Sequence, residues 1–98
     1  MENKKLILSL IKDDLINSKL VNSLNEAGLN ADNYHLYLGQ TIFELMGFKD
    51  NEETEEIFEH YMNLTKRAML MDISQSHKPL DDLAMQIYID LSAKRTSS

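Results

Sequence analysis

The chain has 98 residues, which is enough for one compact domain and too short for two. Three Gly, one Pro and few β-branched residues predict a small number of long helices and no sheet. The formal net charge of −6 disfavours nucleic acid as the main ligand, and the lack of cysteine excludes disulfides and thiolate chemistry.

Acidic residues gather in the second half of the chain. Residues 50–98 contain ten acidic and five basic side chains, whereas residues 1–49 contain six and five. A basic surface is therefore the partner that this charge favours. The apolar run after Lys5 is short and is followed by charged residues where a signal peptide would be cleaved, and no run is long enough to cross a membrane. We expect a cytoplasmic protein.

The first predicted helix begins near Asn3 and ends at Ala27, with Gly28 as the left-handed residue that terminates it. Helical spacing places six apolar residues on one side, which we expect to face the core. These residues are Leu6, Leu10, Leu20, Val21, Leu24 and Ala27.

Two polar residues, Asp13 and Asn17, fall on that same side of the first helix. Either a polar notch faces the core there, or the helix breaks between residues 12 and 18 and Asp14 or Asn17 caps a second piece. We favour a single element that is bent or interrupted.

A turn follows, in which Leu29 is expected to cover the end of the bundle and Asn30 or Asp32 to cap the next helix. That second helix is predicted over residues 33–46. Its inward side is expected to consist of Tyr34, Leu38, Ile42 and Leu45.

The segment 50–75 is predicted to be an uninterrupted helix at the centre of the bundle. Asp50, three residues before Glu53, has the spacing of a capping box, and further glutamates follow at the positive end of the helix dipole. Apolar residues form two adjacent stripes, which implies neighbouring helices on both sides. One stripe is Ile57, Tyr61, Leu64, Ala68 and Met71, and the other is Phe58, Met62, Thr65 and Met69.

The last predicted helix begins at Pro79, because a first helical position does not need the N–H that proline lacks. Residues 94–98 are expected to fray. The whole chain, 1–98, is thus predicted to be one all-α domain, a largely antiparallel four-helix bundle that becomes five-helical if the first helix is broken. The inward side of the last helix is expected to be Leu80, Leu83, Ala84, Ile87 and Leu91.

Motifs for metal binding and catalysis are incomplete in this chain. Glu56 and His60 lie four residues apart and could touch one metal, but zinc needs three or four protein ligands. A di-iron bundle needs Glu three residues before His, where this chain has Ile57. No phosphate-binding glycine loop, nucleophile elbow or zinc-protease motif occurs. We therefore predict no enzyme, no cofactor, no metal and no catalytic residue.

His35 lies in the segment YHLYLGQTIFELMG, with Gly39 four residues later. This segment resembles the phosphoacceptor region of histidine phosphotransfer domains, which are also four-helix bundles. The resemblance implies that His35 accepts a phosphoryl group and that Gly39 leaves room for the donor protein. Leu38 stands where the family has a lysine that steadies the phosphoryl charge. A capping or surface role is the alternative for His35.

The stretch 20–38 has the helix–turn–helix order found in some DNA-binding proteins. Its second helix has no Arg or Lys before Lys49, so phosphate contacts from it would be weak. DNA binding would instead need a basic face, and the candidates for it are Lys4, Lys5, Lys12 and Lys19.

The run Ala68-Met69-Leu70-Met71 is apolar beyond the predicted inward side. Leu70 falls on a polar side of the helix, which indicates either an adaptable docking surface or a segment enclosed by the core. We expect a non-enzymatic protein that binds a protein partner or its own copy; phosphotransfer through His35 and DNA binding through 20–38 are the alternatives. The predicted contact residues are Glu52, Glu55, Glu56, Glu59, Met69 and Leu70.

Overall fold

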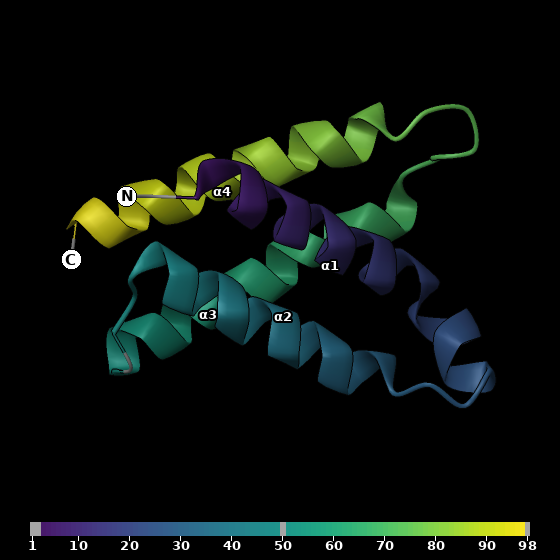
Figure 1. Cartoon of the computed structure of the whole chain (residues 1–98), viewed down its shortest axis with the longest axis horizontal. Helices are drawn as coiled ribbons and strands as arrows, with labels where there is room; N and C mark the ends of the chain where they lie inside the picture. Colours follow the sequence, from purple (N-terminus) through teal and green to yellow (C-terminus); the bar gives the residue numbers. More distant parts are fainter. Residues whose placement is uncertain (1–2, 50, 98) are drawn as a thin grey trace.

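The computed structural model describes residues 3–49 and 51–97, which form four α-helices, one 3₁₀ helix and no strand. Consecutive α-helices run in opposite directions, and the pair α1/α2 lies at an angle to the pair α3/α4 (Figure 1). The prediction of an all-α four-helix bundle is confirmed. The elements are α1 (Lys4–Glu26), α2 (Ala31–Met46), α3 (Glu52–Thr65), η1 (Lys66–Leu70) and α4 (Lys78–Ser97).

The core is organised around α1. This helix packs against α2, α4, η1 and α3, and Ile7, Ile11 and Leu15 on its inner side are fully buried. In α3, by contrast, only Tyr61 and Thr65 are buried. The prediction that the segment 50–75 forms the centre of the bundle is therefore wrong.

The first helix is continuous, so the alternative in which it breaks between residues 12 and 18 is excluded, and the interruption that we favoured is wrong. The polar notch, which was the other possibility, is present. It consists of Asp14 and Asn17, both buried, whereas Asp13 is exposed. Asn17 donates a hydrogen bond of 3.0 Å from its side-chain nitrogen to the carbonyl of Ala31, and this bond ties α1 to the start of α2.

Several apolar residues that were predicted to face the core are exposed instead. In the first half of α1 apolar residues cover most of the helix circumference, so spacing alone does not specify which of them face inward. The structure buries Ile7, Ile11 and Leu15 of α1 and leaves the six residues predicted to face the core partly buried or exposed. In α1, the following turn and α2, the exposed residues among those predicted to face inward are Leu6, Leu20, Ala27, Leu29, Tyr34 and Leu45.

The ends of α2 follow the predicted local chemistry. Asn30 is the N-cap, and its side-chain oxygen accepts a hydrogen bond from the backbone N–H of Asn33. Gly47 ends the helix in the left-handed conformation, with φ of 86°, which glycine adopts without steric cost. Leu38 and Ile42 are buried, as predicted.

The N-cap of α3 is Asn51, whose side chain accepts a hydrogen bond from the N–H of Thr54. The cap predicted at Asp50 concerns a residue outside the described part of the chain. Three glutamates lie in the first turn of α3, where the positive end of the helix dipole favours them.

The α-helical geometry of α3 ends at Thr65, and the 3₁₀ helix η1 follows to Leu70. Met71 is already extended, so the prediction of a helix reaching residue 75 is wrong. The reason is tertiary: Ala68 is buried where η1 packs on α1, and the Lys19 ammonium donates to the carbonyl of Met71. These contacts turn the chain away from the helix axis.

The last helix agrees best with its prediction. All five residues expected to face inward are buried. Pro79 is the second residue of α4 rather than the first, because the helix begins at Lys78. Residues 94–97, where we expected fraying, are helical; Arg95 donates a 2.8 Å hydrogen bond to the carbonyl of Met46. Ser98 lies outside the described residues.

Candidate interaction site

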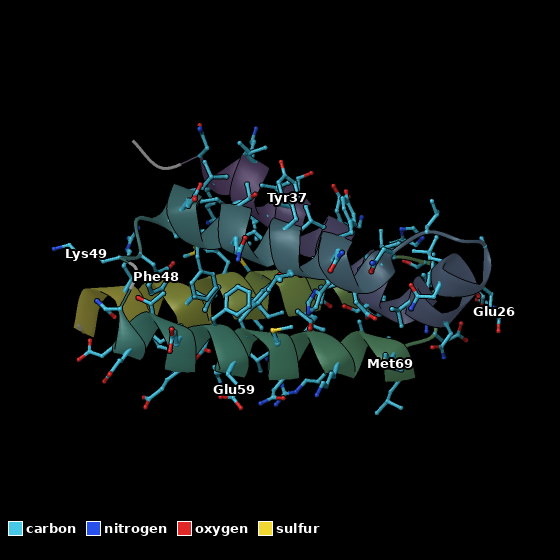
Figure 2. All side chains as sticks on the ribbon, turned by 90° about the horizontal axis from the view of Figure 1, so that it is seen from below. Glu26, Tyr37, Phe48, Lys49, Glu59 and Met69 are labelled. Atoms are coloured by element: carbon cyan, nitrogen blue, oxygen red, sulfur yellow. The ribbon has the colours of Figure 1, made fainter. Side chains whose placement is uncertain are left out.

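The predicted acidic contact residues lie together on the outer side of α3. Glu52, Glu55, Glu56 and Glu59 are exposed, and their spacing of three and four residues places them on one side of the helix. Figure 2 shows Glu59 pointing away from the bundle, on the side opposite to Tyr37. The ion pairs found within the described residues use other carboxylates, so this row of glutamates has no cation bound to it.

This acidic row repels itself. Like charges four residues apart on a helix, such as Glu55 and Glu59, destabilise it by about 0.2 to 0.5 kcal/mol per pair. The positive end of the α3 dipole offsets part of that cost for the first-turn glutamates. Glu59 lies beyond the first turn, so a cation supplied from outside would relieve the repulsion.

The other predicted contact residues, Met69 and Leu70, lie in η1, which follows the C-terminal end of α3. Leu70 is 92% exposed and Met69 is half exposed. The alternative that the core encloses this apolar run is therefore excluded. Lys66 and Arg67, the first residues of η1, are exposed as well, and the Lys66 ammonium lies 3.5 Å from the side-chain oxygen of Asn63. The η1 turn, residues 66–70, therefore exposes two cationic side chains followed along the chain by two apolar ones.

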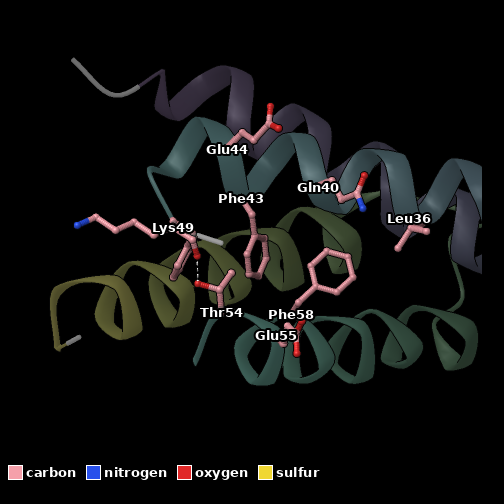
Figure 3. A pocket seen from close by; sticks show the side chains of 9 residues that line it. Leu36, Gln40, Phe43, Glu44, Lys49, Thr54, Glu55 and Phe58 are labelled. Atoms are coloured by element: carbon pink, nitrogen blue, oxygen red, sulfur yellow. Dashed lines mark hydrogen bonds between the residues drawn. The ribbon is translucent and has the colours of Figure 1, made fainter. Parts of the chain in front are cut away.

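A groove of about 550 Å³ lies between α2 and the start of α3. Figure 3 shows the rings of Phe43 and Phe58 on its walls and the Lys49 side chain extending away from it. We call it the phenylalanine groove. Its lining combines four apolar side chains (Leu36, Phe43, Phe48 and Phe58) with five polar ones (Gln40, Glu44, Lys49, Thr54 and Glu55).

The shape of the phenylalanine groove depends on aromatic packing and on one glycine. Phe43 stacks on Phe48 with ring centroids 4.6 Å apart and meets the edge of Phe58 at 5.1 Å. A Cβ atom at Gly39 would lie 2.9 Å from the Phe58 ring, so only glycine lets this ring reach the backbone of α2. The Thr54 hydroxyl donates to the carbonyl of Lys49 and closes the end of the groove (Figure 3).

A buried polar cluster joins three helices behind this surface. The Asp14 carboxylate of α1 is fully buried; one oxygen lies 2.6 Å from Nδ1 of His35 on α2, and the other accepts a 2.5 Å hydrogen bond from the Tyr61 hydroxyl on α3. Burial raises the pKa of Tyr61 well above its usual range, and the charge of Asp14 and the hydrogen bond to it raise that pKa further. The cluster thus fixes the relative positions of α1, α2 and α3.

His35 is far less accessible than the phosphotransfer resemblance implies, because its side chain is only 16% exposed. Its Nδ1 is bonded to Asp14, and His35 lines a second groove of about 400 Å³. Lys66 lines that groove, as do two carboxylates, Asp32 and Glu59. Sequence reasoning singled out His35 but missed both of its partners in the cluster.

The remaining candidate sites are occupied by other interactions. His60, which could have touched a metal together with Glu56, instead lies 2.9 Å from Asp90 of α4, a contact between helices. Nowhere in residues 3–49 and 51–97 do three His, Asp or Glu side chains gather as metal ligands. Of the lysines proposed for a DNA-binding face, Lys12 pairs with Asp81 at 2.9 Å and Lys19 is bonded to a backbone carbonyl.

No family model, curated protein or solved structure matches this chain. None of the helices in the described residues combines the length and the apolar character that crossing a membrane requires.

Proposed function

We propose that this protein is a small non-enzymatic interaction module that binds a protein partner, or its own copy, through the outer face of α3 and η1. The observation that carries this proposal is the position of Leu70, which is 92% exposed on a folded turn at the end of an acidic helix face. Fully burying a leucine side chain contributes about 1.5 to 3 kcal/mol, so a partner that covers Leu70 gains a substantial part of its affinity there.

The η1 turn is anchored rather than loose, which supports a role in recognition. Ala68 is buried beneath it, η1 packs on α1, and the carbonyl of Met71 accepts a hydrogen bond from Lys19. A preformed turn loses little conformational entropy when a partner binds. The four glutamates on the outer side of α3 favour a partner with basic groups. A stable complex would bury about 800 Å² on each side.

Site-specific photocrosslinking tests this proposal. A photoreactive phenylalanine analogue replaces Leu70 in one variant and Tyr37 in the control, because Tyr37 is also exposed but lies on the opposite side (Figure 2). We expect one discrete adduct from position 70, lost when Glu55→Lys is added, and no such adduct from position 37. The absence of any adduct at position 70, or equal adducts at both positions, would contradict the proposal.

We also propose that the protein acts in the cytoplasm, as its composition suggests. Cell fractionation with an antibody to the chain tests this location, and recovery with the membranes or outside the cell would contradict it.

Phosphoryl acceptance by His35 is the second candidate function. It is favoured by one observation: Asp14 holds Nδ1 of His35, and Lys66 lines the same groove as His35, which supplies a cation that Leu38 does not. Asp32 and Glu59 line the same groove and oppose an anion, so this candidate ranks below the first. Incubation with phosphoramidate would give an acid-labile phosphate adduct by intact mass and ³¹P NMR, absent in His35→Gln; no adduct, or an adduct retained in that variant, removes the candidate.

A further inference from the structure

We infer that the partner of the α3/η1 face is a second copy of this chain, in a two-fold symmetric dimer where the η1 turn of each copy enters the phenylalanine groove of the other. This inference rests on the proposed function, which requires only that the face binds some protein. It identifies that protein and the register in which the two chains meet.

The turn and the groove are complementary in polarity and charge. The η1 turn carries the exposed Leu70 next to two cations, Lys66 and Arg67. The groove is lined by four apolar side chains, two carboxylates (Glu44 and Glu55) and one cation (Lys49), so acidic groups outnumber basic ones there. An apolar tip flanked by cations therefore suits this groove, and Leu70 and both carboxylates are exposed in the single chain.

The turn and the groove lie at opposite ends of α3. A single antiparallel arrangement of two copies therefore places the turn of each copy in the groove of the other. Where two copies of α3 lie antiparallel, the start of each faces the end of the other, and a two-fold axis relates the two contacts. The axis crosses α3 midway between Glu55 and Lys66, so Glu55 of each copy faces the second copy's Lys66. Eleven residues separate these two positions, which corresponds to about 16 Å along a helix.

The side chains that would line the dimer contact share one stripe of α3 and η1. Glu55, Glu59, Met62, Lys66 and Met69 follow each other at steps of four and three residues, the spacing that keeps one side of a helix facing a neighbour. A parallel pairing would place the acidic row of one copy against that of the other. Antiparallel pairing places acidic ends beside basic ends, so charge selects the antiparallel register.

A charge-swap experiment tests the register directly. In Glu55→Lys alone, two lysines face each other at both contacts, and in Lys66→Glu alone, two glutamates do. By sedimentation equilibrium we expect the wild-type chain to dimerise and each single variant to dimerise at least about tenfold more weakly. An equimolar mixture of the two variants restores both ion pairs, so it should form heterodimers with affinity close to wild type. Restoration also shows that both variants are folded.

Three further variants separate this dimer from other associations. Leu70→Ser should weaken dimerisation, whereas Tyr37→Ser, on the other side of the molecule, and Glu26→Lys, an equal change of charge at the end of α1, should not. A wild-type chain that stays monomeric at all concentrations overturns the inference, as does a mixture no better than its components. If the chain is monomeric but the crosslinker at position 70 still gives a discrete adduct with a foreign protein, the dimer fails and the proposed function stands.

Discussion

Carboxylates in two regions of this molecule have opposite environments. The Asp14 carboxylate lies inside the bundle, and each of its oxygens has a partner from a different helix. The glutamates of α3 lie on the surface, and none of them has a cation among the described residues. The two regions therefore have different roles. The interior cluster fixes how the helices pack, whereas the glutamates of α3 are available to bind another molecule.

The two histidine–aspartate pairs give the largest contrast between interior and surface. His35→Ala leaves one oxygen of the buried Asp14 carboxylate without its hydrogen-bond partner, and an unsatisfied buried polar group costs about 1 to 3 kcal/mol, or more where it is charged. His60→Ala removes a pair whose side chains are 44% and 40% exposed, for which we expect about 0 to 1 kcal/mol. Urea unfolding of both variants measures the difference. Equal losses would mean that the interior cluster is not stabilising.

Truncation of core side chains compares α1 with α3. Ile11→Ala should lower the free energy of unfolding by about 2 to 5 kcal/mol, because Ile11 is fully buried in the helix that all others contact. Leu64→Ala in α3 should cost less, since Leu64 is only half-buried. Denaturant unfolding of the two variants ranks them. A larger loss at Leu64 would restore α3 as the centre of the bundle.

The alkaline pH dependence of stability isolates the buried cluster. The pKa of Tyr61 is raised in the folded chain, whereas in the unfolded chain a tyrosine ionises near pH 10. The contribution of Tyr61 to the free energy of unfolding is therefore fully present below about pH 10. It is lost as pH rises further, by at most about 1.4 kcal/mol per pH unit. Tyr61→Phe should unfold less steeply with pH between about pH 10 and 11 than the wild type.

Exposed tyrosines provide the control for that pH experiment. Tyr34→Phe and Tyr37→Phe change residues that are half exposed or more, so they should leave the alkaline slope unchanged. A slope that is the same in Tyr61→Phe and wild type would show that Tyr61 ionises as readily in the folded chain as in the unfolded one.

The sequence predicted those parts of the fold that local chemistry decides. The caps at Asn30 and Gly47 follow from the residues themselves, and the inward side of α4 was correct because charged residues clearly mark its outer side. The face of α1 was wrong because leucine and isoleucine occupy several of its sides, and only the neighbouring helices decide which of them is buried.

The site was predictable only where it depends on exposure. An outward position for Leu70 follows from helical spacing, and the structure has it exposed. The Asp14 cluster could not be found in this way, because His35 and Tyr61 are 21 and 47 residues away in the chain. The phenylalanine groove was missed for the same reason: its walls come from two helices, and its width depends on the approach of Phe58 to Gly39.

The smallest change in stability is expected at Leu70, which lies on the exposed face of the molecule. Leu70→Ser replaces a side chain that is 92% exposed, so the free energy of unfolding of the monomer should change by less than about 0.5 kcal/mol. When a dimer dissociates as it unfolds, the denaturant concentration at the unfolding midpoint rises with protein concentration. We expect this rise in the wild type and a smaller rise in Leu70→Ser. Denaturant unfolding at several protein concentrations measures both effects. A large loss at every concentration would mean that Leu70 packs within its own chain, and the division between a satisfied interior and an available outer face would then fail.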